Sequence, residues 1–278
     1  MSEAVSPETW VGPFRTPRNM AAEARGSIHD DATATRLGFR GGTVAGSIHL
    51  DQFVPRLVET FGPRWFETGG LSVYFTQATV DREEVQCAVE PGADRLRLSM
   101  HNHDGALICQ GTASAQPDAG SELARRFETQ TPAAAGALRI LAAMQVGDEN
   151  HDLAVSVAPE TLARSLGVIT EALPAYETGI LPPSLVIHMA HMTREAVMAK
   201  STRPQVALYG ALEVQNLAGP LRVGVDYQAR TRVLKLSESP KTENVWYEVI
   251  FTEAGRDIAR VLYFLRVLKG SSPLWAQG

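Results

Sequence analysis

The sequence has few cysteines and no long apolar run. Cys87 and Cys109 are the only two thiols in 278 residues, and both lie in alternating, strand-like stretches. Two thiols cannot form a disulfide framework, so we expect both to be free, buried and in a reducing compartment. No apolar stretch approaches the ~20 residues that span a bilayer. Residues 1–4 show no signal-peptide pattern, so we expect a cytoplasmic protein without a membrane partner.

The sequence also lacks a basic stripe. It carries 31 acidic and 26 basic residues, a net charge of −5, and a nucleic-acid-binding protein would normally show a positive patch. We therefore expect no nucleic-acid partner. No nicotinamide- or flavin-binding pattern is visible, and the glycines at 41–46 lack the lysine of a P-loop. The sequence thus predicts no bound cofactor.

A metal site is not predicted either. His188, His191 and Glu195 share one face of an expected helix, but they do not follow the H-E-x-x-H zinc pattern. We interpret the two histidines as core or interface residues.

What the chain does contain is an internal repeat. Residues 46–61 have the 3.6-residue apolar spacing of an amphipathic helix, with Pro55 as a point where it can kink or break. Alternating runs at 71–75, 85–89, 96–100 and 107–109 then predict antiparallel strands, with Asp104 and Gly105 in a hairpin turn. A helix from 183 to about 200 repeats the plan. Strands at 206–214, 222–232, 244–252 and 257–267 follow it, with a surface loop expected at 236–243.

The repeat defines the expected domains. The first half spans residues 1–115, a connection with a short helix near 122–127 spans 116–135, and the second half spans 136–278. A helix with one broad apolar face needs a sheet to cover it, and the edges of two such sheets can pair. We therefore expect an α+β fold of two antiparallel sheets, each wrapped round a central helix.

Three short motifs resemble a known family. The segments 28–31 (IHDD), 37–39 (LGF) and 44–46 (VAG) are similar to the pattern of MaoC-like hydratases and dehydratases. In that family an Asn-Pro-x-His-x-Asp stretch leads to a short helix, a Gly-Phe pair, and a His-Gly at the start of the central helix. His29, Asp31 and Gly46 fall on this pattern. The segments 174–176 (PAY) and 181–184 (LPPS) resemble the opposite half of double-hotdog members, so the resemblance covers most of residues 20–267.

The resemblance implies a double hotdog fold and an enzyme similar to (R)-specific enoyl-CoA hydratases. Such an enzyme adds water to an enoyl thioester or removes it from a 3-hydroxyacyl thioester, with coenzyme A or an acyl carrier protein as the thiol. His29 would act as general acid or base, which suits an imidazole. The Gly46 N–H would bind the thioester oxygen, because the first N–H groups of a helix are unpaired. Whether two chains pair into a homodimer stays open.

One departure from the family pattern concerns a catalytic residue. The family has an aspartate five residues before the histidine, and this chain has Ala24 there. Glu23, Asp30 and Asp31 are nearby carboxylates that could replace it, although Asp31 also suits the N-cap of a helix at 31–37. We retain Asp30 and Asp31 as candidate catalytic residues.

Further polar residues are expected to bind the substrate. His49 lies one turn into the first helix, and Glu171 and Tyr176 have the family's acid–histidine spacing with tyrosine in place of histidine. Arginine suits the phosphates of coenzyme A, and the arginines considered for this contact are Arg36, Arg40, Arg64 and Arg82.

Two alternatives to a hydratase remain at this point. A hotdog thioesterase needs a carboxylate near the start of the central helix, and Asp51 is the only one in the first turns. A module that binds an acyl thioester without reacting it would also explain Ala24. The hydratase or dehydratase is the favoured interpretation.

Overall fold

A single antiparallel sheet of ten strands runs through the protein, for which a computed structural model describes residues 9–275. The strand order is β1-β3-β4-β5-β2-β7-β10-β9-β8-β6. In the first half the strands are β1 (Trp10–Val11), β2 (Gly70–Phe75), β3 (Val85–Glu90), β4 (Leu96–Asn102) and β5 (Leu107–Ser114). In the second half they are β6 (Glu149–Val155), β7 (Ala207–Asn216), β8 (Tyr227–Glu238), β9 (Thr242–Glu253) and β10 (Arg256–Leu268).

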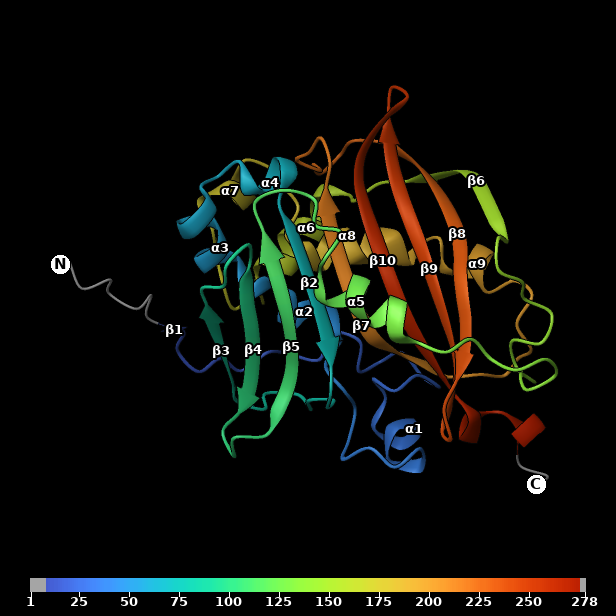
Figure 1. Cartoon of the computed structure of the whole chain (residues 1–278). Coiled ribbons are helices and arrows are strands. Elements are labelled where there is room, and N and C mark those ends of the chain that lie inside the picture. Colours follow the sequence, from blue (N-terminus) through green and yellow to red (C-terminus); the bar gives the residue numbers. More distant parts are fainter. Residues whose placement is uncertain (1–8, 276–278) are drawn as a thin grey trace.

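The two halves join where β2 pairs with β7. Gly70 lies opposite Gln215 and Tyr74 lies opposite Ala211, so five residues of β2 form the seam between the halves. The other strands of each half lie on their own side of this seam (Figure 1). The edge pairing expected from the sequence is thus present, and it merges two small sheets into one.

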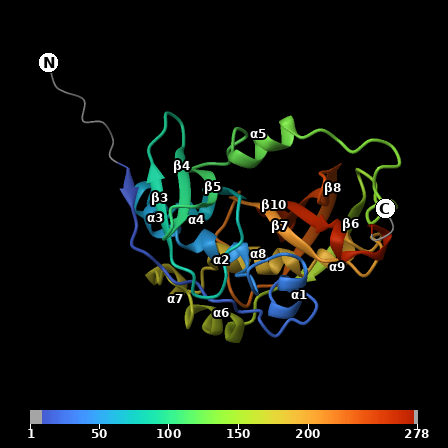
Figure 2. The same ribbon diagram turned by 90° about the horizontal axis from the view of Figure 1, so that it is seen from below.

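Two central helices lie against the concave face of this sheet (Figure 2). The first is α2 (Gly46–Asp51), which continues after a break as α3 (Val54–Phe61), with Pro55 in the first turn of α3. The second is α8 (Pro183–His191), followed by α9 (Arg194–Val197). Each expected long helix is therefore two shorter ones, and proline at a first turn is compatible with the start of a new helix.

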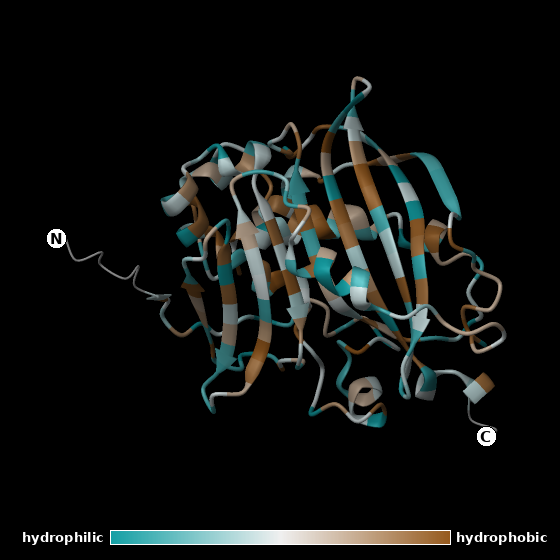
Figure 3. Cartoon of the chain, viewed as in Figure 1, coloured by the Kyte–Doolittle hydropathy of each residue, from teal (hydrophilic) through white to brown (hydrophobic). Residues whose placement is uncertain are grey.

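The sheet faces follow the alternation of the sequence. Along β3 the burial alternates residue by residue, and Figure 3 shows apolar and polar bands succeeding each other along the strands. Most of the core lies between the sheet and the central helices, and the buried cysteines Cys87 and Cys109 belong to it. Both thiols are free, as expected.

A smaller core lies on the opposite face, under α5 (Glu122–Thr129) (Figure 2). Ser121 caps this helix and Leu123 packs fully buried with Trp246 and Phe264. The connection between the halves therefore covers part of the sheet. The remaining helices are α1 (Asp31–Arg36), α4 (Trp65–Thr68), α6 (Pro159–Leu166), α7 (Pro174–Glu177) and the 3₁₀ turns η1 (Lys269–Ser271) and η2 (Pro273–Trp275). No helix among residues 9–275 is long and apolar enough to cross a membrane.

The prediction of a surface loop at 236–243 is wrong. β8 extends to Glu238 and β9 starts at Thr242, which leaves only a short turn between them. Thr242 and Glu243 are buried, and Glu243 accepts hydrogen bonds from the backbone N–H groups of Arg139, Ile140 and Leu141. A segment about 100 residues away covers them, which local sequence cannot show. The strand expected at 222–232 starts only at Tyr227, and β6 and α6 were not expected at all.

The packing of Leu123 in the core under α5 predicts how a substitution there changes stability. Leu123→Ala should lower the free energy of unfolding by about 2–5 kcal/mol, because a buried leucine is replaced by a cavity. Urea unfolding followed by tryptophan fluorescence measures it. The matched control is Glu128→Ala on the exposed side of α5, which should change stability by less than about 0.5 kcal/mol. Equal effects of the two changes would show that α5 is not packed as described.

Candidate active site

A cavity of about 640 Å³ lies where α2 begins and α8 ends. The first half contributes the loop before α1, the start of α2 and the residues that follow β2. The second half contributes the last turn of α8, the start of α9 and the start of β7. The cavity therefore exists only because the seam brings the two halves together.

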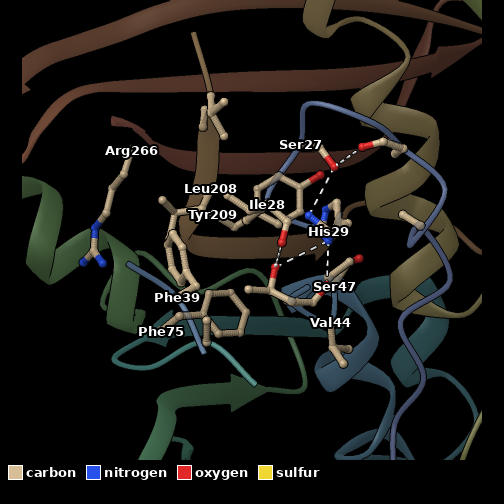
Figure 4. Close-up of a pocket in the computed structure, with 18 of the residues that line it drawn as sticks. Ser27, Ile28, His29, Phe39, Val44, Ser47, Phe75, Leu208, Tyr209 and Arg266 are labelled. Atoms are coloured by element: carbon tan, nitrogen blue, oxygen red, sulfur yellow. Dashed lines mark hydrogen bonds between the residues drawn. The ribbon is translucent and has the colours of Figure 1, made fainter. Parts of the chain in front are cut away.

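His29 lies at the wall of this cavity, and its ring is held in place (Figure 4). Its Nδ1 is 2.7 Å from the carbonyl oxygen of Thr43, and a carbonyl can only accept, so Nδ1 carries the proton. In the neutral ring Nε2 is then the free acceptor. The loop itself is anchored, because the Asn19 amide donates to the His29 carbonyl (2.8 Å) and the Thr43 N–H donates to the Ile28 carbonyl (2.8 Å).

Gly46 begins α2 beside this ring. Ala45 precedes it in an extended conformation, and within residues 9–275 the Gly46 N–H has no hydrogen-bond acceptor. The glycine also serves packing: an added Cβ would lie 2.8 Å from the Phe75 ring. Gly46 thus combines the free N–H that the resemblance implies with a close approach to the sheet.

The candidate roles of Asp30 and Asp31 need correction. Asp30, not Asp31, is the N-cap of α1, and its carboxylate accepts from the Ala32 N–H and the Thr33 hydroxyl. The Asp31 carboxylate accepts from the Gly42 N–H at 2.6 Å. Neither residue lines the cavity, because both side chains are committed to shaping the loop.

No other carboxylate takes their place. Ala24 lines the cavity, whereas Glu23 is exposed outside it. Among the described residues that form the wall there is no aspartate or glutamate. The missing acid of the family pattern is therefore not supplied by a neighbouring carboxylate.

The interpretation of His188 and His191 as core residues is wrong, while an interface role stays a prediction. Both lie on the face of α8 that borders the cavity and both are exposed to it. His191 Nδ1 is 2.9 Å from the hydroxyl of Tyr209 on β7, which also lines the cavity. Glu195 points elsewhere and pairs with Arg203 at 2.6 Å. Within residues 9–275 no cluster of three or more His, Cys, Asp or Glu side chains could hold a metal.

These second-half residues were missed because local sequence does not say which helix face meets the other half. The available signal was their i, i+3 spacing at the end of the helix. Because α2 and α8 run in opposite directions, the end of one helix meets the start of the other.

The arginines at the cavity also differ from those expected. Arg25, Arg194 and Arg266 line it, and within residues 9–275 none of the three forms a salt bridge. In Figure 4 Arg266 lies well apart from His29, at the other end of the view. Its guanidinium donates to the Tyr74 hydroxyl at 2.6 Å.

The four arginines named from the sequence are not part of the cavity wall. Arg40 pairs with Glu83 at 2.6 Å, and Arg64 pairs with Glu67 at 3.5 Å. Both side chains are therefore held by carboxylates, and Arg40 also donates to the Ala78 carbonyl at 3.3 Å.

His49 also lines the cavity, although the residue is almost completely buried at 2% exposure. Its Nε2 is 2.8 Å from the Thr79 hydroxyl, and burial lowers the pKa of His49 to about 4. A neutral ring in this position supports the loop after β2. It contributes little surface for a substrate.

The start of α8 is the counterpart, in the second half, of the start of α2, and it is closed. Asp51, the last residue of α2, accepts a hydrogen bond of 2.9 Å from the Ser184 N–H at the start of α8. Tyr176 is buried beside it, and Glu171 forms an ion pair with Arg15. Asp51, Tyr176 and Glu171 therefore lie away from the cavity, which corrects the expected substrate contacts of Tyr176 and Glu171.

The fold defines a class of protein before any relative is considered. Each half wraps its strands round a central helix, and the strands of the two halves form one continuous sheet. This arrangement makes the chain a double hotdog protein. No protein-family model matches the chain, and no curated protein matches its sequence.

Solved structures do match it over nearly its whole length. A Chloroflexus aurantiacus protein named as a MaoC-domain dehydratase has 10% sequence identity and a TM-score of 0.62, with 96% of both chains covered. A conserved hypothetical protein of Mycobacterium tuberculosis with a double hotdog fold has 11% identity and a TM-score of 0.58, covering 96% of this chain and 97% of that one. A Lactobacillus plantarum protein named as an oleoyl thioesterase has 11% identity and a TM-score of 0.52, with 94% and 97% covered. At these identities the likeness shows the double hotdog fold, and the chemistry must be argued from the site.

The burial of Asp51 predicts how the free energy of unfolding depends on pH. Burial raises the pKa of Asp51 to about 7, whereas an unfolded aspartate ionises near pH 4. As pH rises from about 4 to about 7 the unfolded state loses its proton first, so the free energy of unfolding should fall over this range, by up to roughly 4 kcal/mol.

The Asp51→Asn variant should lose that part of the pH dependence, because its amide keeps an acceptor for the Ser184 N–H without titrating. Urea unfolding at pH 5, 6, 7 and 8 measures the difference. Asp104→Asn in the exposed hairpin turn is the control and should leave the pH dependence unchanged. An identical pH profile in the wild type and Asp51→Asn would contradict the assignment.

Proposed function

We propose that the protein hydrates an enoyl thioester, or dehydrates a 3-hydroxyacyl thioester, that is bound in this cavity. The observation that carries the proposal is the His29 ring, whose Nδ1 is fixed to the Thr43 carbonyl while the ring lines a cavity at the start of α2. With the proton on Nδ1, Nε2 of the neutral ring is free to take a proton from a substrate.

The substrate would place its thioester carbonyl at the start of α2. The free Gly46 N–H can donate to the carbonyl oxygen, on which negative charge develops when the Cα proton is removed. His29 would take that proton in dehydration and return it in hydration. Coenzyme A or an acyl carrier protein would then be the thiol part of the substrate.

Two observations weigh against a thioesterase of the kind considered from the sequence. Asp51 is not in the cavity, because it caps the start of α8. Among the residues that the structure describes, the wall has no carboxylate to activate a water molecule. A module that only binds an acyl thioester is the remaining alternative, and turnover distinguishes it from an enzyme.

His29→Gln should lower kcat/KM for crotonyl-CoA hydration by about 10²–10⁴-fold, because the variant lacks the base. The assay follows the loss of enoyl absorbance. His103→Gln, an exposed histidine of the β4–β5 hairpin, is the matched control and should retain wild-type activity. Binding of crotonyl-CoA without turnover by the wild type would favour the binding module instead.

Arg266 gives a second prediction for the same site. If its guanidinium meets a phosphate of coenzyme A, Arg266→Gln should raise KM for a coenzyme A thioester by about tenfold, which corresponds to about 1.4 kcal/mol. KM for the matching N-acetylcysteamine thioester, which has no phosphate, should not change. Arg64→Gln, in an exposed surface pair, should affect neither substrate. An equal rise for both thioesters would show that Arg266 does not contact phosphate.

A further inference from the structure

The proposed dehydration needs a proton for the leaving hydroxide as well as a base. Within residues 9–275 the cavity wall has no carboxylate, and Ala24 cannot move a proton. The donor must therefore come from another type of side chain. The wall offers two kinds opposite the first half: the histidines of α8 and the hydroxyl of Tyr209.

Tyr209 is held firmly. Its hydroxyl is 2.9 Å from His191 Nδ1, and the two rings meet edge to face at 6.3 Å and 86°. On its other side the ring packs against Tyr263 at 5.7 Å, and the Tyr263 hydroxyl donates to the Ile187 carbonyl at 2.8 Å. The phenol is thus braced by α8 and β10 while it borders the cavity.

From this the geometry points to Tyr209 as the general acid of the site, with His191 as a positioning residue that donates its Nδ1–H to the phenol oxygen. This assignment rests on the proposed dehydratase function. It makes the catalytic pair a histidine from the first half and a tyrosine from the second.

The surroundings of the pair keep both groups in the protonation states that the proposal needs. Partial burial lowers the pKa of His191 to about 4, so the ring is neutral at pH 7 and has one N–H to donate. Burial raises the pKa of Tyr209 to about 12, which keeps the phenol protonated, while the charge of Arg194 acts in the opposite direction. The same Arg194 charge would stabilise the phenolate when the proton leaves.

His29 Nε2 takes the Cα proton, and the electrons of the Cα–H bond form the Cα=Cβ double bond. The Cβ–O bond breaks, and its electrons stay on the oxygen, which takes the Tyr209 proton and leaves as water. The imidazolium of His29 loses its proton and the phenolate regains one through solvent, so no other reactant is needed.

The test compares two leaving groups. Hydroxide needs a proton in order to leave, whereas chloride does not. With 3-hydroxybutyryl-CoA, Tyr209→Phe should lower kcat by about 10²–10⁴-fold. With 3-chlorobutyryl-CoA, kcat of Tyr209→Phe should stay within about threefold of the wild-type value, because loss of chloride needs only the base. His29→Gln should lower kcat with both substrates.

His191 is tested by a conservative and a disruptive change. His191→Asn can still donate from a side-chain N–H and should retain most activity on 3-hydroxybutyryl-CoA, whereas His191→Leu should lose it. With 3-chlorobutyryl-CoA both variants should remain active.

Several outcomes would overturn the assignment. Wild-type turnover of 3-hydroxybutyryl-CoA by Tyr209→Phe would reject Tyr209 as the acid, and so would equal losses with both leaving groups. Tyr209 would also be rejected if His188→Gln, and not Tyr209→Phe, lowered kcat with 3-hydroxybutyryl-CoA but not with 3-chlorobutyryl-CoA. In each of these cases the dehydratase function itself stands. A wild-type protein that turns over neither compound would instead reject that function, and the assignment with it.

Discussion

The pairing of β2 with β7 is the constraint on which the rest of the structure depends. Five residues of β2, from Gly70 to Tyr74, hold the two halves in one sheet and fix how their central helices meet. The helices run in opposite directions, so the start of each lies by the end of the other. The cavity at the start of α2 consequently has one wall from each half, and its chemistry depends on a backbone register rather than on a single motif.

The two helix starts then differ because of what fills the space beside them. At α2 no side chain caps the first turn, and Gly46 leaves the space that the Phe75 ring uses. At α8 the Asp51 carboxylate binds the Ser184 N–H, and Tyr176 is buried next to it. The two halves repeat one plan of helix and strands but differ in the side chains at their helix starts, and within residues 9–275 only the start of α2 borders the 640 Å³ cavity.

Much of the fold could be predicted from local patterns. The change of period after residue 61 separated helix from strands, and Pro55 marked the break between α2 and α3. The motif around His29 indicated where the loop meets the first central helix. Local patterns failed where distant segments decide the outcome: Glu243 can be buried in β9 because the N–H groups of residues 139–141 bind its carboxylate.

The candidate site shows the same limit. His29 and Gly46 were named from the sequence and line the cavity, while Asp30 and Asp31 do not, because adjacent aspartates at a helix start suit capping as well as catalysis. His191 and Tyr209 are 18 positions apart and belong to a helix and a strand of the other half. No spacing rule connects them to His29, and only the register of the seam brings them to the same cavity.

The closed start of α8 has a consequence for stoichiometry. A chain of this length contains two hotdog units but only one accessible helix start. A titration with a slowly dissociating thioester analogue should therefore reach saturation at one molecule per polypeptide, not two, whatever the number of chains that associate in solution.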